Sequence, residues 1–193
     1  MADALIELVE LIRSSDWLVR VLETVRDESI PDAWVGAGVL RDFVWGERYG
    51  SGFSPDRVRD VDVAFFDSDN LSRANDGRVT EQLQRRLPDV PWEATNQAAV
   101  HTWYADTFGG GAVQPLTSMH DAVGTWPETA TAVAVRLNTD NATEICAPLG
   151  IDDLLNGVWR RNPRRVTIAQ SLARLQRHQP QLRWPGITVI PPA

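Results

Sequence analysis

The segment 33–46 constrains the fold most, because a short apolar run turns at glycine residues directly into a helical pattern. Residues 33–36 (AWVG) predict a buried strand, and residues 38–46 (GVLRDFVWG) predict a helix. Such a turn exposes backbone N–H groups at the positive end of a helix, where a phosphate can bind. A polar loop follows, and residues 60–67 (DVDVAFFD) then alternate acidic and apolar side chains, which is typical of a strand entering a core.

Helices and strands alternate along the remaining sequence. Apolar spacing predicts two short helices over 2–27, the second capped by Ser14, Ser15 or Asp16. Further helices are predicted over 80–87, 97–104, 151–160 and 167–177, and further strands over 92–96, 131–137 and 142–147. We therefore expect an α/β (α+β) fold, with a small mixed sheet flanked by helices.

We expect one domain over 1–193, because no internal repeat or long linker divides the chain. It comprises a helical N-terminal lead (1–28), a core with the glycine turn and the acidic strand (32–97), and additional strands and helices (98–193). The sequence has neither an export signal nor a run of about 20 apolar residues, so we expect a cytoplasmic protein with no membrane partner.

Residue usage excludes several classes of chemistry. All 19 basic residues are arginine, which excludes Schiff-base lysines and the phosphate-binding lysine of P-loop enzymes. The single cysteine, Cys146, excludes an internal disulfide and a multi-cysteine zinc site. A net charge of −7 disfavours the wrapping of long nucleic acid. The arginines within 160–165 form either a solvated surface or a local attractant for a phosphate-bearing acceptor, and His178 is expected at the surface.

Asp60 and Asp62 are the strongest catalytic candidates. Because they stand two apart in a strand, their side chains project from one face, where they repel each other unless a cation joins them. Hard cations such as Mg²⁺ prefer carboxylate oxygens, and a third carboxylate on the neighbouring strand completes a two-metal site. The order of the elements favours Glu93 for this position, with Glu144 and Asp140 as rivals. The alternative is that the pair only caps a loop or binds nearby arginines.

The glycine turn, followed by a strand with Asp-x-Asp, resembles the nucleotidyltransferase superfamily named after DNA polymerase beta. Residues 36–42 (GAGVLRD) are also similar to the Gly-Gly-x-Val-Arg-Asp signature of tRNA CCA-adding enzymes and bacterial poly(A) polymerases. Ala37 replaces the first glycine of that signature. The large helical RNA-binding body of those enzymes is not recognisable in this sequence.

A second resemblance extends over nearly the whole chain, to a bacterial family of small, single-domain nucleotidyltransferase family proteins. It implies a polymerase beta-like fold and nucleotidyl transfer that depends on Mg²⁺ (or Mn²⁺), and it leaves the acceptor open. Five segments carry it in order: AGVLRDFVW (37–45), DVDVAFFD (60–67), WEATNQAAVHTWY (92–104), WPETATAVAVRL (126–137) and APLGIDDLL (147–155).

The resemblance implies catalytic roles for three carboxylates. Asp60 and Asp62 match the paired metal ligands of the superfamily. Glu93 lies where the third carboxylate is found, on the strand after the intervening helix. It would be a further metal ligand, and the general base or base-orienting group for the acceptor hydroxyl.

Four further residues are candidates for nucleotide binding. Gly36 and Gly38 match the phosphate-binding turn, and Arg41 in the same motif is able to fork onto a phosphate. Asn96 follows Glu93 closely enough to line the same cleft, unless it caps the helix that starts there.

Together these features predict an enzyme that transfers a nucleoside monophosphate from an NTP, such as ATP, to an acceptor and releases pyrophosphate. The negative net charge favours a small molecule or a protein as the acceptor over RNA. Two alternatives stay open. One is a nucleotide-binding or regulatory module that kept the fold without catalysis, and the other is a metal-dependent phosphohydrolase that uses water as the acceptor.

Overall fold

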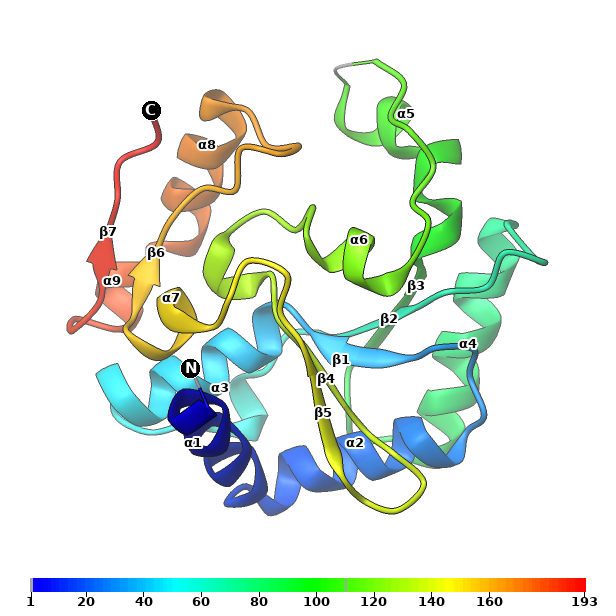
Figure 1. Ribbon diagram of the computed structural model, residues 1–193, viewed down its shortest axis with the longest axis horizontal. Helices are drawn as coiled ribbons and strands as arrows, with labels where there is room; N and C mark the ends of the chain where they lie inside the picture. Colours follow the sequence, from blue (N-terminus) through cyan, green and yellow to red (C-terminus); the bar gives the residue numbers. More distant parts are fainter. Residues whose placement is uncertain (1, 110) are drawn as a thin grey trace.

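A computed structural model describes residues 2–109 and 111–193. Its centre is a five-stranded sheet in the order β3-β2-β1-β4-β5 (Figure 1). The parallel pair β2–β3 and the antiparallel pairs around it make the sheet mixed, as predicted. The strands are β1 (Trp34–Gly36), β2 (Val61–Phe65), β3 (Trp92–Asn96), β4 (Ala134–Leu137) and β5 (Thr143–Cys146).

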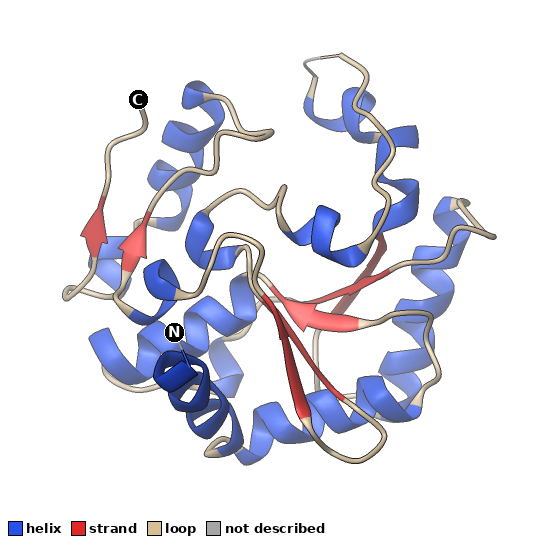
Figure 2. Ribbon diagram, in the orientation of Figure 1, coloured by secondary structure: helices blue, strands red, loops and turns tan. Residues whose placement is uncertain are grey.

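Helices cover both faces of this sheet. In Figure 1, α2 runs below the sheet and α6 lies above it, and Figure 2 shows the sheet strands surrounded by helices. The helices of the first part of the chain pack on the face that carries Val35 and Val63. They are α1 (Ala2–Arg13), α2 (Asp16–Asp27), α3 (Gly38–Tyr49) and α4 (Arg73–Arg86).

The opposite face of the sheet is covered by α6 (Met119–Val123). Met119 and Val123 of this helix pack on Trp34, Ala64 and a group of neighbouring small residues. Because side chains alternate along a strand, Asp62 points to the same face as Ala64. The α6 face is therefore the one that carries Asp62, the acidic residue of β2.

Local sequence explains the helix boundaries in the first part of the chain. Ser15 caps α2, since its side chain accepts a hydrogen bond from the amide of Leu18. The buried stripe of α2 includes Leu18, Val21 and Leu22, as its apolar spacing predicts. The predicted pair of N-terminal helices is thus confirmed, and α4 begins earlier than predicted, at Arg73.

The region between β3 and β4 is built from short helices. The predicted helix over 97–104 is a 3₁₀ helix, η2 (Gln97–Thr102), followed by α5 (Tyr104–Phe108). A second 3₁₀ turn, η3 (Thr129–Thr131), occupies the beginning of the strand predicted over 131–137. Another short 3₁₀ segment, η1 (Pro55–Arg57), lies in the loop that leads to β2.

The helix predicted over 151–160 is wrong in its second half. The observed helix, α7 (Asp152–Leu155), ends before Gly157, which has a positive φ of 64° that a helix cannot contain. Residues Val158–Trp159 form β6 instead, because they pair with β7 (Thr188–Val189). The pairing partner lies about thirty residues away, so local periodicity could not reveal it.

The last part of the chain consists of α8 (Ile168–His178), α9 (Pro180–Arg183) and β7. Thr167 and Gln170 form a capping box at the start of α8, close to the predicted start of this helix. Arg174 of α8 reaches the buried carboxylate of Glu128 with two hydrogen bonds, of 2.6 and 2.9 Å. This ion pair fixes α8 to the segment before η3. Within the described residues, no helix is long and apolar enough to cross a membrane.

Candidate active site

Three carboxylates meet at one end of the sheet. Asp62 of β2 and Glu93 of β3 are direct neighbours in the parallel register, and Asp60 lies two residues before Asp62. In an aligned parallel pair, neighbouring residues project to the same face. The antiparallel register that pairs Val35 with Val63 brings the glycine turn after β1 to this same end. The structure thus brings the three predicted carboxylates and the glycine turn together.

The charge of Asp62 is strongly disfavoured. Burial raises the pKa of this carboxyl to about 7, and the negative charges of Asp60 and Glu93 contribute in the same direction. The backbone amide of Gly38 and the guanidinium of Arg41 oppose the shift by favouring the carboxylate. The negative charges of Asp60 and Glu93 and the positive charge of Arg41 thus act on the same carboxyl, a combination that is common in clefts that bind a cation or a substrate.

This raised pKa predicts a pH dependence of stability in metal-free buffer. Since the folded-state pKa lies above the unfolded value, the contribution of Asp62 is fully present below about pH 4 and is lost as the pH rises toward 7. We expect the difference in unfolding free energy between Asp62→Asn and wild type to shift in favour of the variant by roughly 3 kcal/mol when the pH is raised from 5 to 8. Urea unfolding of both chains in EDTA at the two pH values measures this difference. A constant difference would contradict the shift.

The two glycines of the turn have different surroundings. A Cβ atom at Gly36 would lie 2.7 Å from the ring of Trp126 and 2.8 Å from the carbonyl oxygen of Val133. A Cβ atom at Gly38 would lie 3.6 Å from Oδ2 of Asp62 and 3.8 Å from Nη2 of Arg41. Gly36 is therefore required for packing beneath Trp126, whereas Gly38 faces the carboxylates. The two predicted phosphate-turn residues do not share one role.

Ala37 occupies a backbone conformation that normally requires glycine, with φ 54° and ψ −120°. A side chain at this position strains the backbone. We expect Ala37→Gly to raise the free energy of unfolding by about 1 kcal/mol, because the strain is relieved without loss of a packed side chain. Chemical denaturation measures the change. Ala33→Gly, at an ordinary negative φ, is the matched control and should destabilise the chain; a loss of stability in both variants would refute the strain.

Arg41 is held beside the turn by aromatic rings and by its neighbour. Only 3% of the residue is exposed, and its guanidinium carbon lies 5.2 Å from the ring centroid of Trp159 and 5.4 Å from that of Trp184. Nε and Nη2 donate to Oδ1 of Asp42 at 3.0 and 2.6 Å. Cation–π contacts and an ion pair thus fix the guanidinium close to Gly38.

Asn96 has a structural role, which corrects its prediction as a nucleotide-binding residue. The residue is fully buried. Its Oδ1 accepts from the amides of Asp67 and Ala98, and its Nδ2 donates to the carbonyl oxygens of Asp67 and Asn70. These bonds cap η2 and hold the loop after β2, so no polar atom of the side chain is left to face a ligand.

The rival carboxylates lie away from the acidic pair. Glu144 is on β5, at the edge of the sheet opposite β3, and is bound by Arg136 at 2.7 Å. Asp140 accepts a hydrogen bond from the amide of Ala142 in the hairpin between β4 and β5. Of the three candidates, Glu93 is therefore the one that stands beside Asp62.

The carboxylates are chemically suited to bind Mg²⁺, but they do not form a complete metal site by themselves. Among residues 2–109 and 111–193, no three His, Cys, Asp or Glu side chains are arranged to hold a metal ion by themselves. Mg²⁺ in nucleotide sites is held by one or two carboxylates together with substrate phosphates and waters. Asp60 and Asp62 supply such oxygens, and the repulsion at Asp62 is of the kind that a cation relieves.

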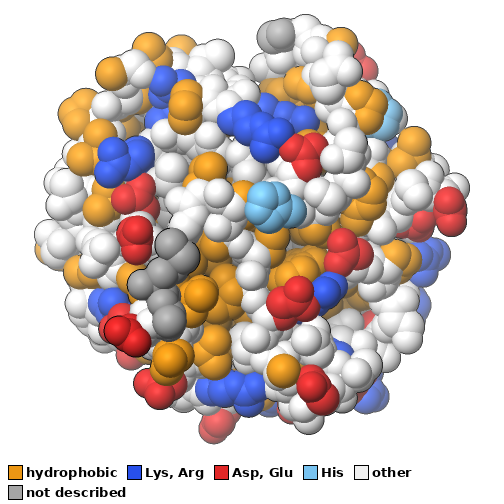
Figure 3. Space-filling model, in the orientation of Figure 1, with side chains coloured by type: hydrophobic (Ala, Val, Ile, Leu, Met, Phe, Trp, Pro, Cys, Tyr) orange, Lys and Arg blue, Asp and Glu red, His pale blue; other side chains and the backbone are white. Residues whose placement is uncertain are grey.

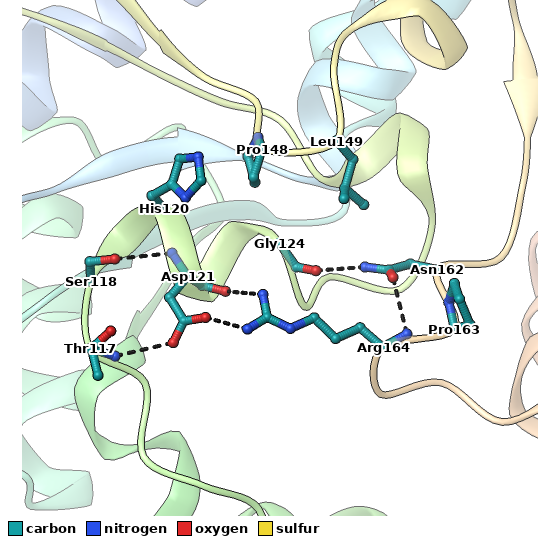
Figure 4. Close-up of a pocket in the computed structure, with 10 residues that line it drawn as sticks. All are labelled: Thr117, Ser118, His120, Asp121, Gly124, Pro148, Leu149, Asn162, Pro163 and Arg164. Atoms are coloured by element: carbon teal, nitrogen blue, oxygen red, sulfur yellow. Dashed lines mark hydrogen bonds and ion pairs between the residues drawn. The ribbon is translucent and has the colours of Figure 1, made fainter.

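The arginines within 160–165 are largely occupied by internal contacts. Arg160 pairs with Asp153 at 2.8 Å, and Arg164 binds both the side chain and the backbone carbonyl of Asp121. Figure 4 shows Arg164 extended across a pocket of about 690 Å³ to reach Asp121. Basic and acidic side chains are interspersed on the face drawn in Figure 3. Arg160 and Arg164 are thus paired with carboxylates, whereas Arg161 and Arg165 contact the backbone carbonyl oxygens of Val166 and Gln114, so the positive charge of this segment is only partly neutralised.

The family of the chain follows from a comparison with protein-family models. The model described as Nucleotidyltransferase matches residues 23–189, which contain all three carboxylates and the glycine turn. The chain belongs to this nucleotidyltransferase family. Membership makes the protein an NTP-using transferase and confirms the resemblance noted from the sequence.

The fold of this nucleotidyltransferase is similar to solved structures of CCA-adding enzymes. An NMR structure described as revealing a CCA-adding enzyme head domain is 29% identical, with a TM-score of 0.78 over 95% of this chain and 94% of that one. A CCA-adding enzyme in complex with CTP is 16% identical, with a TM-score of 0.56 over 95% of this chain. A tRNA-processing enzyme without ligand is also 16% identical, with a TM-score of 0.54 over 89% of this chain.

The polymerase beta-like fold predicted for this nucleotidyltransferase is confirmed by these similarities. The chain spans 42% of the length of the CTP complex and of the tRNA-processing enzyme. At this low identity, the similarity to the two larger proteins shows a shared fold and does not show which substrates the nucleotidyltransferase uses. A search of curated proteins finds no match.

Proposed function

We propose that the protein is a Mg²⁺-dependent nucleotidyltransferase that moves a nucleoside monophosphate from an NTP to a small-molecule or protein acceptor. The observation that carries this proposal is the register of β2 and β3, which sets Glu93 beside Asp62 and near Asp60, at the end of the sheet where the turn with Gly38 lies. Carboxylates and a phosphate-binding turn are the two parts that phosphoryl chemistry requires in one place.

Asp60 and Asp62 are proposed to hold the metal, with Glu93 as a further ligand. When bound, the ion would neutralise the phosphates and polarise the α-phosphorus. Glu93 is exposed and adjacent to Asp62, which suits a group that orients the acceptor hydroxyl and takes its proton. Gly38 leaves room for the phosphates at the start of α3, and Arg41 supplies positive charge beside them.

The proposed reaction is a displacement at the α-phosphorus. The acceptor oxygen forms a bond to this phosphorus as the bond to the bridging oxygen of the β-phosphate breaks. The hydroxyl proton passes to Glu93, and pyrophosphate leaves with the electron pair. The net charge of −7 supports a small molecule or a protein as the acceptor over a long RNA. We propose that the whole chain, 1–193, is one domain built around this site.

The released product tests the proposal. NTPs labelled on the α- or on the γ-phosphate are incubated with the protein, Mg²⁺ and fractionated small molecules and proteins as acceptors. The proposal predicts release of labelled pyrophosphate from the γ-labelled NTP and incorporation of the α-label into an acceptor. Orthophosphate as the main product would indicate a phosphohydrolase. Tight binding of Mg·NTP without either product would indicate a silent nucleotide-binding module.

A further inference from the structure

A second positive region adjoins Arg41, on the C-terminal turns of α8. Arg177 contacts His178, with Nη2 of the arginine 3.1 Å from Nε2 of the imidazole. The ring of His178 in turn lies 5.5 Å from that of Trp159, the same indole on which Arg41 packs. His178 was expected at the surface, yet it is half-buried in this cluster. The cluster thus joins α8 to the helix that begins at the glycine turn.

The groups around His178 have an excess of positive charge. Burial and the nearby guanidinium groups of Arg41, Arg174 and Arg177 lower the pKa of His178 to about 3, whereas Asp42 acts in the opposite direction. The imidazole is therefore neutral at physiological pH. Three guanidinium groups and one carboxylate thus act on this position, although the chain as a whole carries a net charge of −7.

The ion pairs of this region do not cancel the excess. Arg174 is neutralised by Glu128, and Asp42 is shared between Arg41 and Arg183, with contacts of 2.6 Å to each. Arg177 has no carboxylate partner within the described part of the chain. Four guanidinium groups are thus matched by two carboxylates, which leaves about two positive charges uncompensated.

A buried hydrogen-bond donor in the same cluster is also left unsatisfied. Nε1 of Trp159 has no hydrogen-bond partner in the described structure, and only 1% of this residue is exposed. An unpaired buried N–H is costly and calls for an explanation. An anionic oxygen is the kind of group that would satisfy such a donor among arginines.

We propose that Arg177, together with His178 and Arg41, forms the site for the two terminal phosphates of the donor nucleotide. The inference rests on the proposed function, since it extends the path of the phosphates from Asp62 and Gly38, past Arg41, to α8. The excess of two positive charges complements a nucleoside triphosphate that has already bound one divalent cation. Arg177 is then the residue that selects a triphosphate over a monophosphate, and it also holds the pyrophosphate product.

Calorimetric titration of the full-length chain tests the assignment. Mg·ATP, AMP and magnesium pyrophosphate are titrated into wild type, Arg177→Gln and the matched control Arg85→Gln, whose side chain is exposed on α4. We expect Arg177→Gln to weaken Mg·ATP and pyrophosphate about tenfold and to leave AMP unchanged. The control should bind all three ligands as wild type does. Arg177 is exposed, so the variant should keep the melting temperature of wild type.

The outcomes separate this inference from the proposed function. Equal affinities of Arg177→Gln and wild type for Mg·ATP and pyrophosphate would overturn the inference. An equal weakening of AMP would also overturn it, because Arg177 would then not act on the terminal phosphates. Wild type is also titrated with Mg·GTP, Mg·CTP and Mg·UTP, and wild type that binds pyrophosphate through Arg177 but none of the four NTPs would retain the anion site and refute the proposed function. Wild type that binds neither pyrophosphate nor any of the four NTPs would refute both.

Discussion

Replacing Asp62 with asparagine should lower the rate of nucleotidyl transfer by about 10³-fold, because the substitution removes a charged metal-binding oxygen at the centre of the site. Asn keeps the size of the side chain and one accepting oxygen, while it replaces the other carboxylate oxygen with an NH₂ group that cannot bind a cation. The same change removes the half-buried negative charge that Asp60 and Glu93 repel. The metal-free variant should therefore melt above wild type at pH 8, which excludes unfolding as the reason for lost activity.

Glu144→Gln is the matched control for this prediction. It also neutralises a carboxylate on a sheet strand, but Glu144 lies on β5 and is bound by Arg136. Steady-state release of pyrophosphate from Mg·NTP, measured for wild type and both variants, compares the two positions. The control should retain most of the activity. Similar rates for Asp62→Asn and wild type would remove Asp62 from the mechanism.

Replacing Arg174 with methionine should destabilise the protein by about 3 kcal/mol, because it leaves the carboxylate of Glu128 buried without its partner. Glu128 is only 1% exposed, and Arg174 donates two hydrogen bonds to it. For a chain of this length the loss corresponds to a fall in melting temperature of roughly 6–12 °C. Calorimetric or fluorescence-monitored unfolding measures it.

A double variant distinguishes the buried charge from lost packing. Glu128→Met combined with Arg174→Met removes both charges and should recover a large part of the stability, since a buried ion pair is often replaceable by apolar side chains. Arg160→Met, which breaks the more exposed pair with Asp153, should change stability by about 1 kcal/mol or less. A large loss in the double variant and a small one in Arg174→Met would contradict this interpretation of the pair.

The position of the acidic residues could be predicted from the sequence because it depends on local patterns. Alternation in 60–67 and the apolar spacing around Glu93 define two strands, and a helix between them is compatible with the parallel register that joins Asp62 to Glu93. The glycine turn could be predicted for the same reason, because it depends only on residues that are neighbours in the sequence. Only the register could show that Glu93, and not Glu144, stands beside the pair.

Other features depended on contacts between distant segments. Asn96 has the same sequence context as a ligand-binding amide, and only the loop containing Asp67 and Asn70 shows that its polar atoms are consumed. The requirement for glycine at position 36 comes from Trp126, ninety residues later in the chain. The helix that carries Arg177 and His178 was predicted from its spacing, but its packing against Arg41 and Trp159 depends on contacts between distant segments, which the sequence pattern does not show.

The central claim is that Asp60 and Asp62 bind a nucleoside triphosphate through a divalent cation. Thermal unfolding with each of the four NTPs, with and without Mg²⁺, tests this most directly when wild type is compared with the Asp60→Asn/Asp62→Asn double variant. The account predicts that at least one NTP raises the melting temperature of wild type only when Mg²⁺ is present, and that the double variant shows no such rise. An equal, Mg²⁺-dependent rise in the double variant would contradict the assignment of the site.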